Sequence, residues 1–559
     1  MSLGTTPVAS ASDNPVATQA TAGVRGWRKD LRSPTPYLFL LTLAGISLWV
    51  INWWAARPLF LDEANVARNL FDRSFFQLFT PLDHQQYAPP LYLVMAKACG
   101  EVFGYSERAL RLPALLAGLT TVIALFRAGR TLRLGWALLI PLGLLFANPT
   151  VLRYVTEVKP YALDLAVAAW LMTFALDERT TLRRWTAAGV LAPWLSLPSV
   201  FVLAAVGSYQ SLSATRTDKL RWIGVIATWL AAFAALYALV LAPSANRGYL
   251  QNFHADHFFP LPTGEGFDLQ RAASLVLLQL RLTFGFTAWS LLWGSLLTIL
   301  ALRYVRSRTV VLALVPVVIV FAVSATGKYS LFPRLLLFTL PGWWLLLGYS
   351  TQRLYADLTE KPTADRPETD PPIANGPHLS APILSTLLAL AWAGVLLGTN
   401  VARHYTNPLR TGDGRAVVSN LPPDYQPILH YSTLPLYDYY HRIAPSRNQS
   451  GLPPGTDQAV RSPRYDRDTS ATVADSVFPT IQPPLLTTIE ELPQRGSYAF
   501  LFATTTRGSI RRRVEATAAY ARSNGAVDVR TERFFRAARV LVTYSPDTPP
   551  RPSSAAGLR

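Results

Sequence analysis

Two adjacent carboxylates, Asp62 and Glu63, follow closely after the first long apolar segment of the chain, residues 36–56 (PYLFLLTLAGISLWVINWWAA). A segment of about 20 apolar residues is long enough to cross a bilayer. Carboxylates at a membrane boundary are costly to desolvate, so they usually bind or activate something there. One such group could serve as a general base. The alternative is that both residues only start a helix, because acidic side chains interact favourably with a helix N-terminus.

A second group of ionisable residues lies in the segment 153–164 (RYVTEVKPYALD), where another apolar run begins. Ionisable groups that enter a membrane span usually pair with each other or face a cavity. Lys159 could neutralise an anion, with Arg153 close by in the sequence. The alternative is a lysine that reaches toward the membrane surface and is held by an ion pair with Glu157. Asp164 lies deeper in the run and is expected to face the bundle in either case.

The composition indicates what kind of protein positions these residues. The chain has 559 residues, of which 50% are hydrophobic and only 15% are charged, and its mean hydropathy is +0.22. Because average soluble proteins carry about 25% charged residues, these values indicate a polytopic membrane protein. The net charge of +18 comes from short basic clusters between apolar runs, a pattern typical of cytoplasmic loops and not of nucleic-acid binding. A single cysteine, Cys99, excludes an internal disulfide and a cysteine-based zinc site.

Further apolar runs recur along the chain, and we expect about eleven membrane spans in all. After the first run they lie at 110–127, 134–150, 160–176, 185–197, 198–212, 222–242, 286–303, 309–325, 334–352 and 381–402. The segment 185–212 contains Pro193 and Pro198, so it could be one kinked span or a hairpin of two. With a cytoplasmic N-terminus, a hairpin keeps the basic clusters inside, whereas a single span would place the later ones outside. The hairpin is therefore favoured.

The same topology predicts the division of the chain into domains. A strand, a helix and a second strand are indicated at 497–505, 510–523 and 538–545, which together predict a small α/β domain outside the membrane. The expected regions are a disordered cytoplasmic tail at 1–35, a transmembrane domain at 36–402 whose first external loop at 57–109 contains interfacial helices, the external α/β domain at 403–546, and a disordered tail at 547–559.

Four segments stand in a characteristic order: LDEANVARNLFDRSFFQLFTPLDHQQYAPPLYL from Leu61, FGYSERALRLPALLAG at 103–118, RYVTEVKPYALDLAVA at 153–168 and YSLFPRLLLFTLP at 329–341. Together they resemble the GT-C membrane glycosyltransferases of the protein O-mannosyltransferase and lipid A aminoarabinose transferase superfamily. The resemblance is greatest to its bacterial branch with the RgtA/B/C/D-like domain. It covers about residues 36–350. The fold expected from it is a polytopic α-helical membrane protein, with the small α/β domain added at the C-terminal end.

The resemblance implies transfer of a hexose or pentose from a polyprenyl-phosphate donor, with no nucleotide sugar. The acceptor, which is a lipid, a glycan or a protein, would lie on the outer face of a bacterial inner membrane. Phosphate departs as a stable anion, so the reaction needs no second carboxyl as an acid, unlike glycoside hydrolysis. It needs a base for the acceptor hydroxyl and cations for the phosphate. Asp62 matches the family's catalytic acidic position and is assigned as the base of an inverting transfer, with Glu63 orienting the acceptor or holding the base.

Three basic residues are the candidates for binding the donor phosphate. Lys159 and Arg153 come from one segment, and Arg334 follows Pro333 at a position where the resemblance implies a phosphate contact. Arginine suits phosphate because its planar fork donates two hydrogen bonds at once. The alternative for Arg334 is anchoring at the membrane boundary.

Four residues are expected to contact substrate: Glu157, Tyr161, Tyr87 and Pro90. The last two belong to QYAPP at 86–90, where the chain departs from the aminoarabinose transferases, which carry an acidic-basic pair before their proline. A metal ligand or phosphate lysine therefore does not carry over from that position. Asp83 and His84 could bind a cation, although a solvated loop pair is the simpler interpretation. The metal is left unassigned, no cofactor is implied with certainty, and a divalent cation stays open.

Two other functions are weighed against glycosyl transfer. A transporter or flippase of lipid-linked sugars would place charges at several depths of the membrane, whereas Asp62, Lys159 and Arg334 gather at one face in the predicted topology. A non-catalytic scaffold for the external domain would tolerate the change Asp62→Asn. Both stay as alternatives to the transferase.

Overall fold

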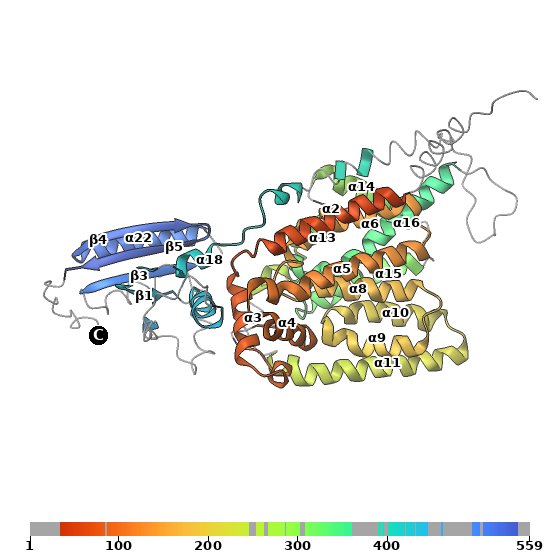
Figure 1. Ribbon diagram of the computed structural model, residues 1–559. Helices are drawn as coiled ribbons and strands as arrows, with labels where there is room; N and C mark the ends of the chain where they lie inside the picture. The colour runs from red at the N-terminus through yellow and green to blue at the C-terminus, as the bar shows by residue number, and fades with distance from the viewer. Residues whose placement is uncertain are drawn as a thin grey trace, which may run out of the picture.

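The computed structural model describes residues 34–83, 86–244, 253–261, 267–285, 287–301, 308–359, 390–392, 394–395, 401–419, 421–430, 432–444, 460–461, 495–503 and 507–545. These residues form a long helical body with a small sheet at one end (Figure 1). The tails predicted to be disordered and most of the predicted span at 381–402 lie outside the described residues.

Helices account for nearly all of the body. In chain order they are α2 (Thr35–Trp54), α3 (Leu61–Asp72), α4 (Pro90–Phe103), α5 (Glu107–Thr131), α6 (Leu139–Ala147), α7 (Pro149–Tyr154), α8 (Tyr161–Leu176), α9 (Leu182–Leu195), α10 (Ser199–Ser213), α11 (Arg216–Leu236), α13 (Leu269–Phe284), α14 (Ala288–Ala301), α15 (Arg308–Ala325) and α16 (Leu340–Thr359). Short turns η5 (Ala255–His257) and η7 (Pro333–Thr339) lie between them.

Hydroxyl side chains mark several helix starts. Ser106, Thr181 and Thr215 precede α5, α9 and α11, and each accepts a hydrogen bond from the amide three residues further along. Such a cap satisfies one of the amides that a helix start leaves without a partner. Pro90 begins α4, where the missing N–H of proline costs nothing.

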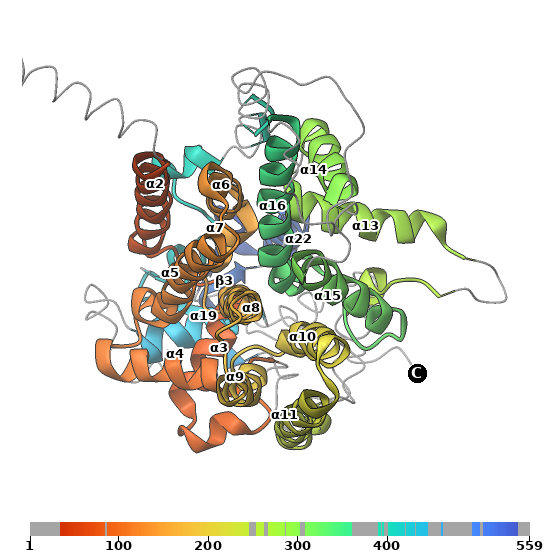
Figure 2. The same cartoon turned by 90° about the vertical axis from the view of Figure 1, so that its right-hand side faces the viewer.

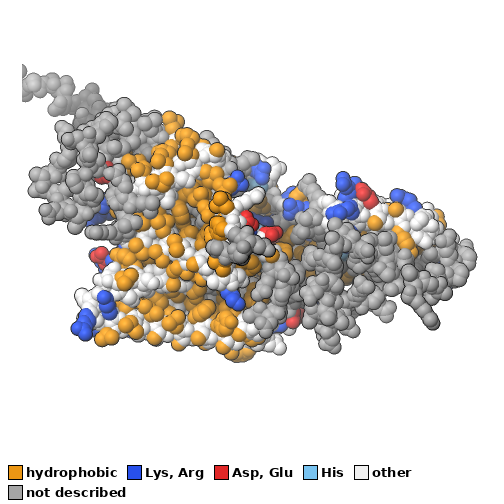
Figure 3. Space-filling view, turned by 180° about the vertical axis from the view of Figure 1, so that it is seen from behind, with side chains coloured by type: hydrophobic (Ala, Val, Ile, Leu, Met, Phe, Trp, Pro, Cys, Tyr) orange, Lys and Arg blue, Asp and Glu red, His pale blue; other side chains and the backbone are white. Residues whose placement is uncertain are grey.

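Four described helices are long and apolar enough to span a membrane: α2, α5, α11 with the turn that continues it to Leu241, and α15. The helices α13 and α14 meet at 89° and together would make one more. Apolar helices that are shorter occur at Gly135–Ala147, α8 and α10. Hydrophobic side chains also cover much of the surface of the body on the side that Figure 3 shows. These features support a membrane protein, and the number of about eleven spans stays a prediction.

The segment with two prolines folds back on itself. The helices α9 and α10 lie side by side in both ribbon views (Figures 1 and 2), and the chain reverses between Leu195 and Ser199. α11 packs against both of these helices, and its Trp229 donates its indole N–H to the carbonyl oxygen of Trp185 in α9 over 3.0 Å. Gly189 allows this approach, because a Cβ there would lie 2.1 Å from the ring of Trp229. The hairpin interpretation of the sequence agrees with this arrangement.

The sheet has the strand order β2-β1-β3-β5-β4. Its strands are β1 (Tyr425–Leu429), β2 (Val460–Arg461), β3 (Gly496–Ala503), β4 (Ala526–Phe534) and β5 (Ala537–Tyr544), and the helix α22 (Arg507–Ser523) packs against it. β1 runs parallel to β2 and β3, whereas β5 is antiparallel to β3 and β4. The predicted strands and helix correspond to β3, α22 and β5.

Three strands were not predicted from the sequence. β4 is an edge strand of charged and polar residues (AVDVRTERF) without a buried face, β1 is short and contains Pro427, and β2 has only two residues. None of them shows the apolar alternation that predicts a half-buried strand. The paired neighbours supply the hydrogen bonds that define them.

The sheet lies at the end of the body where α3 and α4 lie (Figure 1). The short helices α18 (Gly414–Val418) and α19 (Leu434–Asp438) fill the space between the sheet and α3. Apolar side chains of α3, α4, α18, α19 and β3 belong to one buried cluster. The first predicted external loop and the C-terminal domain therefore share a core.

Candidate functional site

Asp62 lies in the first turn of α3, at the sheet end of the body, and is partly exposed. Its carboxylate makes no hydrogen bond or ion pair with any residue that the structure describes. It lies close enough to interact electrostatically with Lys159, Tyr161 and Arg334. Residues from α3, the segment before α8, α8 itself and η7 thus converge, as the sequence predicts for the base and two of the phosphate ligands.

Unlike Asp62, Glu63 is completely buried, with a side chain that is 0% exposed. Arg111 of α5 donates from Nε to Oε1 over 2.9 Å and from Nη2 to Oε2 over 3.0 Å. The amides of Val158 and Phe60 donate to Oε1 and Oε2 over 2.8 Å and 3.0 Å. Both oxygens are therefore engaged inside the protein. Glu63 is not available to a substrate in this structure, in contrast to the acceptor contact that we expected for it.

The same bonds set the charge of Glu63. Burial would raise its pKa, but the charges of Arg111 and Arg57 and the hydrogen bonds outweigh burial and lower the pKa to about 2. Glu63 is therefore ionised at all physiological pH values.

Glu157 is also buried and pairs with arginines. Its Oε2 lies 2.8 Å from Nε of Arg153 and 3.8 Å from Nη2 of Arg57. Arg57 also donates from Nη1 to Oγ1 of Thr156 over 2.7 Å. Burial, followed by the charge of Arg111, lowers the pKa of Arg57 to about 10. Arg57 was not a candidate site residue from the sequence, because a single arginine after a membrane span is typical of a membrane boundary.

Lys159 is only 6% exposed, and its Nζ donates to Oε1 of Gln86 over 2.8 Å. The alternative interpretation required a lysine at the membrane surface held by Glu157. In the described part of the chain Glu157 pairs with arginines instead, and Lys159 is buried. Gln86 belongs to the segment in which the chain departs from the aminoarabinose transferases. Its uncharged amide accepts a hydrogen bond from the ammonium group of Lys159.

Arg334 is packed among aromatic rings. Its Cζ lies 4.7 Å from the ring centre of Phe332 and 5.7 Å from that of Tyr161. Its Nε is buried and finds no hydrogen-bond partner in the described residues. A boundary anchor would expose its guanidinium to water and headgroups, whereas this buried N–H is oriented into the protein.

Two histidines lie beside Arg334, close enough for electrostatic interaction. Nδ1 of His254 is 3.1 Å from Oγ of Ser330, and the ring of His257 is 4.7 Å from that of Phe332. Burial, together with the charge of Arg334, lowers the pKa of His254 to about 4, so this ring is neutral near pH 7. Neither histidine was a candidate site residue from the sequence, because both lie in a polar segment far from every motif.

Buried polar groups continue into the body from Tyr161. Asp164, one helical turn further along α8, is buried, and so are Ser196 and Ser199 of the α9–α10 hairpin. Asp164 and Ser196 lie close enough to interact by a hydrogen bond. The hydroxyl of Ser199 has no hydrogen-bond partner in the described residues. Tyr329 lies within electrostatic range of Asp164 and Tyr161. Buried polar groups without partners are rare in native proteins, and a ligand or water commonly satisfies them.

The other residues that the sequence predicted to contact substrate or a cation lie in or near the QYAPP segment. Tyr87 is partly exposed, and Pro90 is buried at the start of α4. Asp83 pairs with Arg73 over 3.0 Å, as a loop ion pair does, and its neighbour His84 lies outside the described residues. Within those residues, no group of three or more His, Cys, Asp and Glu side chains is arranged to hold a metal ion.

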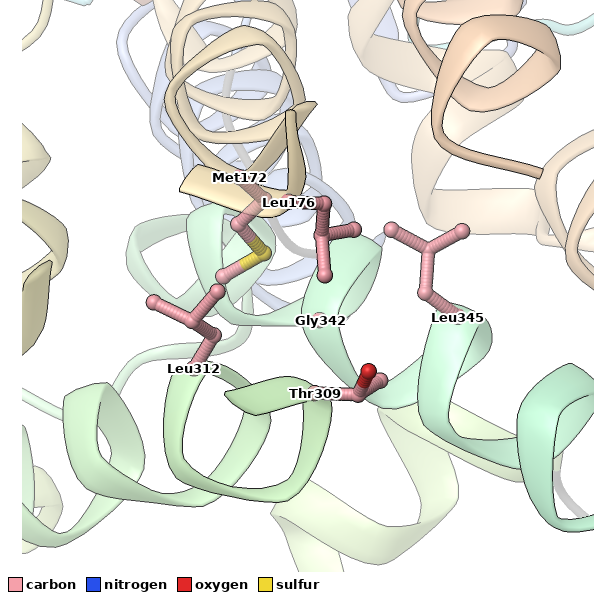
Figure 4. Close-up of a pocket in the computed structure, with 6 residues that line it drawn as sticks. All are labelled: Met172, Leu176, Thr309, Leu312, Gly342 and Leu345. Carbon is pink, nitrogen blue, oxygen red and sulfur yellow. The ribbon is translucent and has the colours of Figure 1, made fainter. Parts of the chain in front are cut away.

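A small apolar cavity elsewhere in the body does not contribute to this group. It is lined by residues of α8, α15 and α16, namely Met172, Leu176, Thr309, Leu312, Gly342 and Leu345 (Figure 4). No ionisable side chain lines it, and it lies near the other end of α8 from Tyr161. The polar site is thus separate from it.

The chain is similar to ArnT from Cupriavidus metallidurans. The crystal structure of that protein in the apo state aligns over 91% of this chain and 98% of that chain, with 16% sequence identity and a TM-score of 0.50. A structure of the same protein bound to undecaprenyl phosphate aligns over the same shares, with 14% identity and a TM-score of 0.48. No protein-family model matches the chain, and no curated protein does. The fold therefore resembles that of ArnT, in agreement with the fold resemblance predicted from the sequence.

Proposed function

We propose that this protein is an integral membrane glycosyltransferase of a bacterial inner membrane. It would move a sugar from a polyprenyl-phosphate donor to an acceptor on the outer face. The observation that carries the proposal is the carboxylate of Asp62, unpaired within the described residues, in electrostatic range of two cations at one end of an apolar helical body: Lys159, which is buried, and Arg334, which is partly buried. The GT-C-like fold supports it.

Asp62 acts as the general base in this proposal. Its carboxylate accepts the proton of the acceptor hydroxyl while that oxygen bonds to the anomeric carbon of the donor sugar. The bond from the anomeric carbon to the phosphate oxygen breaks, and polyprenyl phosphate leaves with the electron pair. Because attack and departure occur on opposite faces of the sugar, the configuration inverts. No acid is needed for a leaving group that is already a stable anion.

Lys159 and Arg334 hold the phosphate. Burial in an apolar surrounding strengthens their attraction for an anion, and the N–H of Arg334 that lacks a partner would donate to a phosphate oxygen. Arg153 is not assigned to the phosphate, because its guanidinium is already paired with Glu157. We assign Arg153 and Glu157 the role of supporting the residues around the site, without direct contact with substrate.

The donor sugar would lie next to Tyr161. From there the buried polar side chains of Asp164, Ser196 and Ser199 extend into the body, and they can exchange hydrogen bonds with sugar hydroxyls. Tyr87 is partly exposed and is retained as a contact at the rim.

The test uses purified protein in lipid nanodiscs with a polyprenyl-phosphate sugar and candidate acceptors. Asp62→Asn should abolish transfer while donor binding persists, because a carboxamide cannot accept the proton. The matched control is Glu101→Gln on α4, a neighbouring external carboxylate that pairs with Lys97. Full transfer by Asp62→Asn would refute the base assignment.

A transporter or flippase is the competing function. It would need polar groups along a path through the body, yet beyond Asp164 the rest of α8 (LAVAAWLMTFAL) carries no ionisable residue. Movement of labelled lipid-linked sugar between the leaflets of proteoliposomes, without any transfer, would favour this alternative.

A further inference from the structure

The segment that leads into α3, residues 56–60, is held by side chains along its whole length. On the side of the helical body, Arg111 of α5 donates to the carbonyl oxygens of Arg57 and Pro58 over 2.7 Å and 3.5 Å. The amide of Phe60 donates to Glu63 over 3.0 Å. Three backbone groups just before Asp62 are thus fixed by buried charged side chains.

The other two contacts come from the C-terminal domain. Arg415 donates from Nη2 to the carbonyl oxygen of Ala56 over 3.1 Å. The amide of Leu59 donates to the hydroxyl of Tyr440 over 2.9 Å, and that hydroxyl donates to Oε1 of Glu107 over 3.0 Å. Arg415 also pairs with Glu107. Tyr440 is only 3% exposed, so water does not compete for the two hydrogen bonds of its hydroxyl.

The far end of α3 is fastened by the same domain. Nε of Arg68 lies 2.7 Å from Oδ2 of Asp438. Arg442 donates to both carboxylate oxygens of Asp72 over 2.6 Å and 3.0 Å, and its Nε lies 2.7 Å from Oδ1 of Asp438. These residues make a continuous chain of ion pairs between the two parts of the molecule.

Apolar packing fills the space between the two polar contacts. Buried residues of the C-terminal domain and of α3 belong to one cluster, which includes Val417, Leu436, Tyr439, Ile443, Ala64, Ala67 and Leu70. The hydroxyl of Tyr439 donates to the carbonyl oxygen of Tyr105 over 2.6 Å, next to the start of α5. The domain therefore covers α3 along its length.

We infer that the C-terminal domain is a positioning element of the site. Arg415 and Tyr440 hold the start of α3, and Asp438 and Arg442 hold its end, so together they fix the place of Asp62. An isolated helix as short as α3, which has 12 residues, is marginal in water and frays first at its ends. Asp62 lies in the first turn, where such fraying would displace it most. This inference rests on the proposed role of Asp62 as a base.

Two variants of the C-terminal domain test it. Tyr440→Phe removes the hydroxyl bound by the amide of Leu59, and Asp438→Asn weakens the pairs with Arg68 and Arg442. The control is Asp528→Asn, which breaks an ion pair with Arg530 in the same domain, on the edge strand β4 and away from α3. We expect kcat to fall roughly tenfold or more in both variants, since small misplacements of a catalytic group cost large factors in rate. The KM for the donor should stay within about twofold, because Lys159 and Arg334 hold the phosphate independently.

Hydrogen–deuterium exchange of the amides at 59–66 provides a readout that does not depend on catalysis. Exchange there should rise in Tyr440→Phe and not in Asp528→Asn. If kcat and exchange both stay at the wild-type values, the inference is wrong. A rise in the KM for the acceptor with unchanged kcat and exchange would make the domain an acceptor-binding element instead. If the wild-type protein shows no glycosyl transfer but amide exchange still rises in Tyr440→Phe, the C-terminal domain does position α3 and the proposed function is wrong.

Discussion

Asp62 and Glu63 are neighbours in the sequence with opposite surroundings in the structure. Asp62 is unpaired within the described residues and lies in electrostatic range of Lys159 and Arg334, whereas Glu63 is saturated by hydrogen bonds from Arg111 and two amides. A base must keep a free lone pair for the incoming proton, so only Asp62 suits that role. Glu63 instead ties the start of α3 to α5 and to the segment before α8.

The pH dependence of stability tests the role of Glu63. Its pKa is lowered from 4.5 to about 2 in the folded protein. A lowered pKa contributes stability that is fully present above the unfolded value and is lost as pH falls toward the folded value. We therefore expect the melting temperature to fall between pH 4.5 and pH 2, and Glu63→Gln to lack this part of the fall while melting lower at pH 7. Equal pH profiles for the two proteins would contradict the assignment.

Removing the two phosphate cations tests the donor site. Lys159→Ala together with Arg334→Ala should raise the KM for the polyprenyl-phosphate donor by about a hundredfold or more, because charged hydrogen bonds in a buried site are worth about 1.5–3 kcal/mol each. Lys219→Ala, an exposed lysine at the start of α11, serves as the control. Unchanged donor KM in the double variant would rule out both contacts.

At the scale of single elements, close approach of helices depends on small residues. α9 and α11 pack through the contact between Gly189 and the ring of Trp229, where even one added methyl group would collide. This contact fastens α11 to the α9–α10 hairpin, which carries Ser196 and Ser199.

Substituting the glycine tests this packing. Gly189→Ala should destabilise the protein by about 1–3 kcal/mol, as overpacking of a close contact does, and lower its melting temperature. Gly224→Ala on α11 is the matched control, because a Cβ there meets no atom within 4 Å. The packing argument fails if both variants melt at the same temperature.

At the scale of the whole molecule, α3, which carries Asp62, and the C-terminal domain lie at the same end of the helical body (Figure 1). Asp62, Lys159 and Arg334 come from segments far apart in the sequence, and the predicted topology assigns them and the C-terminal domain to the outer face. The membrane orientation itself stays a prediction.

Labelling of single cysteines tests the orientation. After Cys99→Ser removes the natural cysteine, Ser523→Cys at the end of α22 should react with a membrane-impermeant maleimide on intact cells. Glu178→Cys, between α8 and α9, should react only after the membrane is opened. The reverse pattern would invert the topology and place the candidate site inside the cell.

The sequence by itself determined the features that depend on local periodicity and motif order. Apolar runs predicted a helical membrane protein, and the basic loops favoured a hairpin at α9 and α10 over a single kinked span. The motifs predicted the GT-C-like fold and named Asp62, Lys159 and Arg334 as candidates. The strands β3 and β5 were predicted because their residues are apolar. The edge strand β4 was missed, since only its neighbour defines it.

Only the tertiary structure decided which of these side chains are free. It paired Glu63 with Arg111 and Glu157 with Arg153, and left Asp62 without a partner in the described residues. It also brought His254 beside Arg334, and Tyr440 onto the amide of Leu59, across 381 positions of sequence. The physical reason is that burial and pairing depend on contacts between distant segments, whereas the types and spacing of residues record only what lies close along the chain.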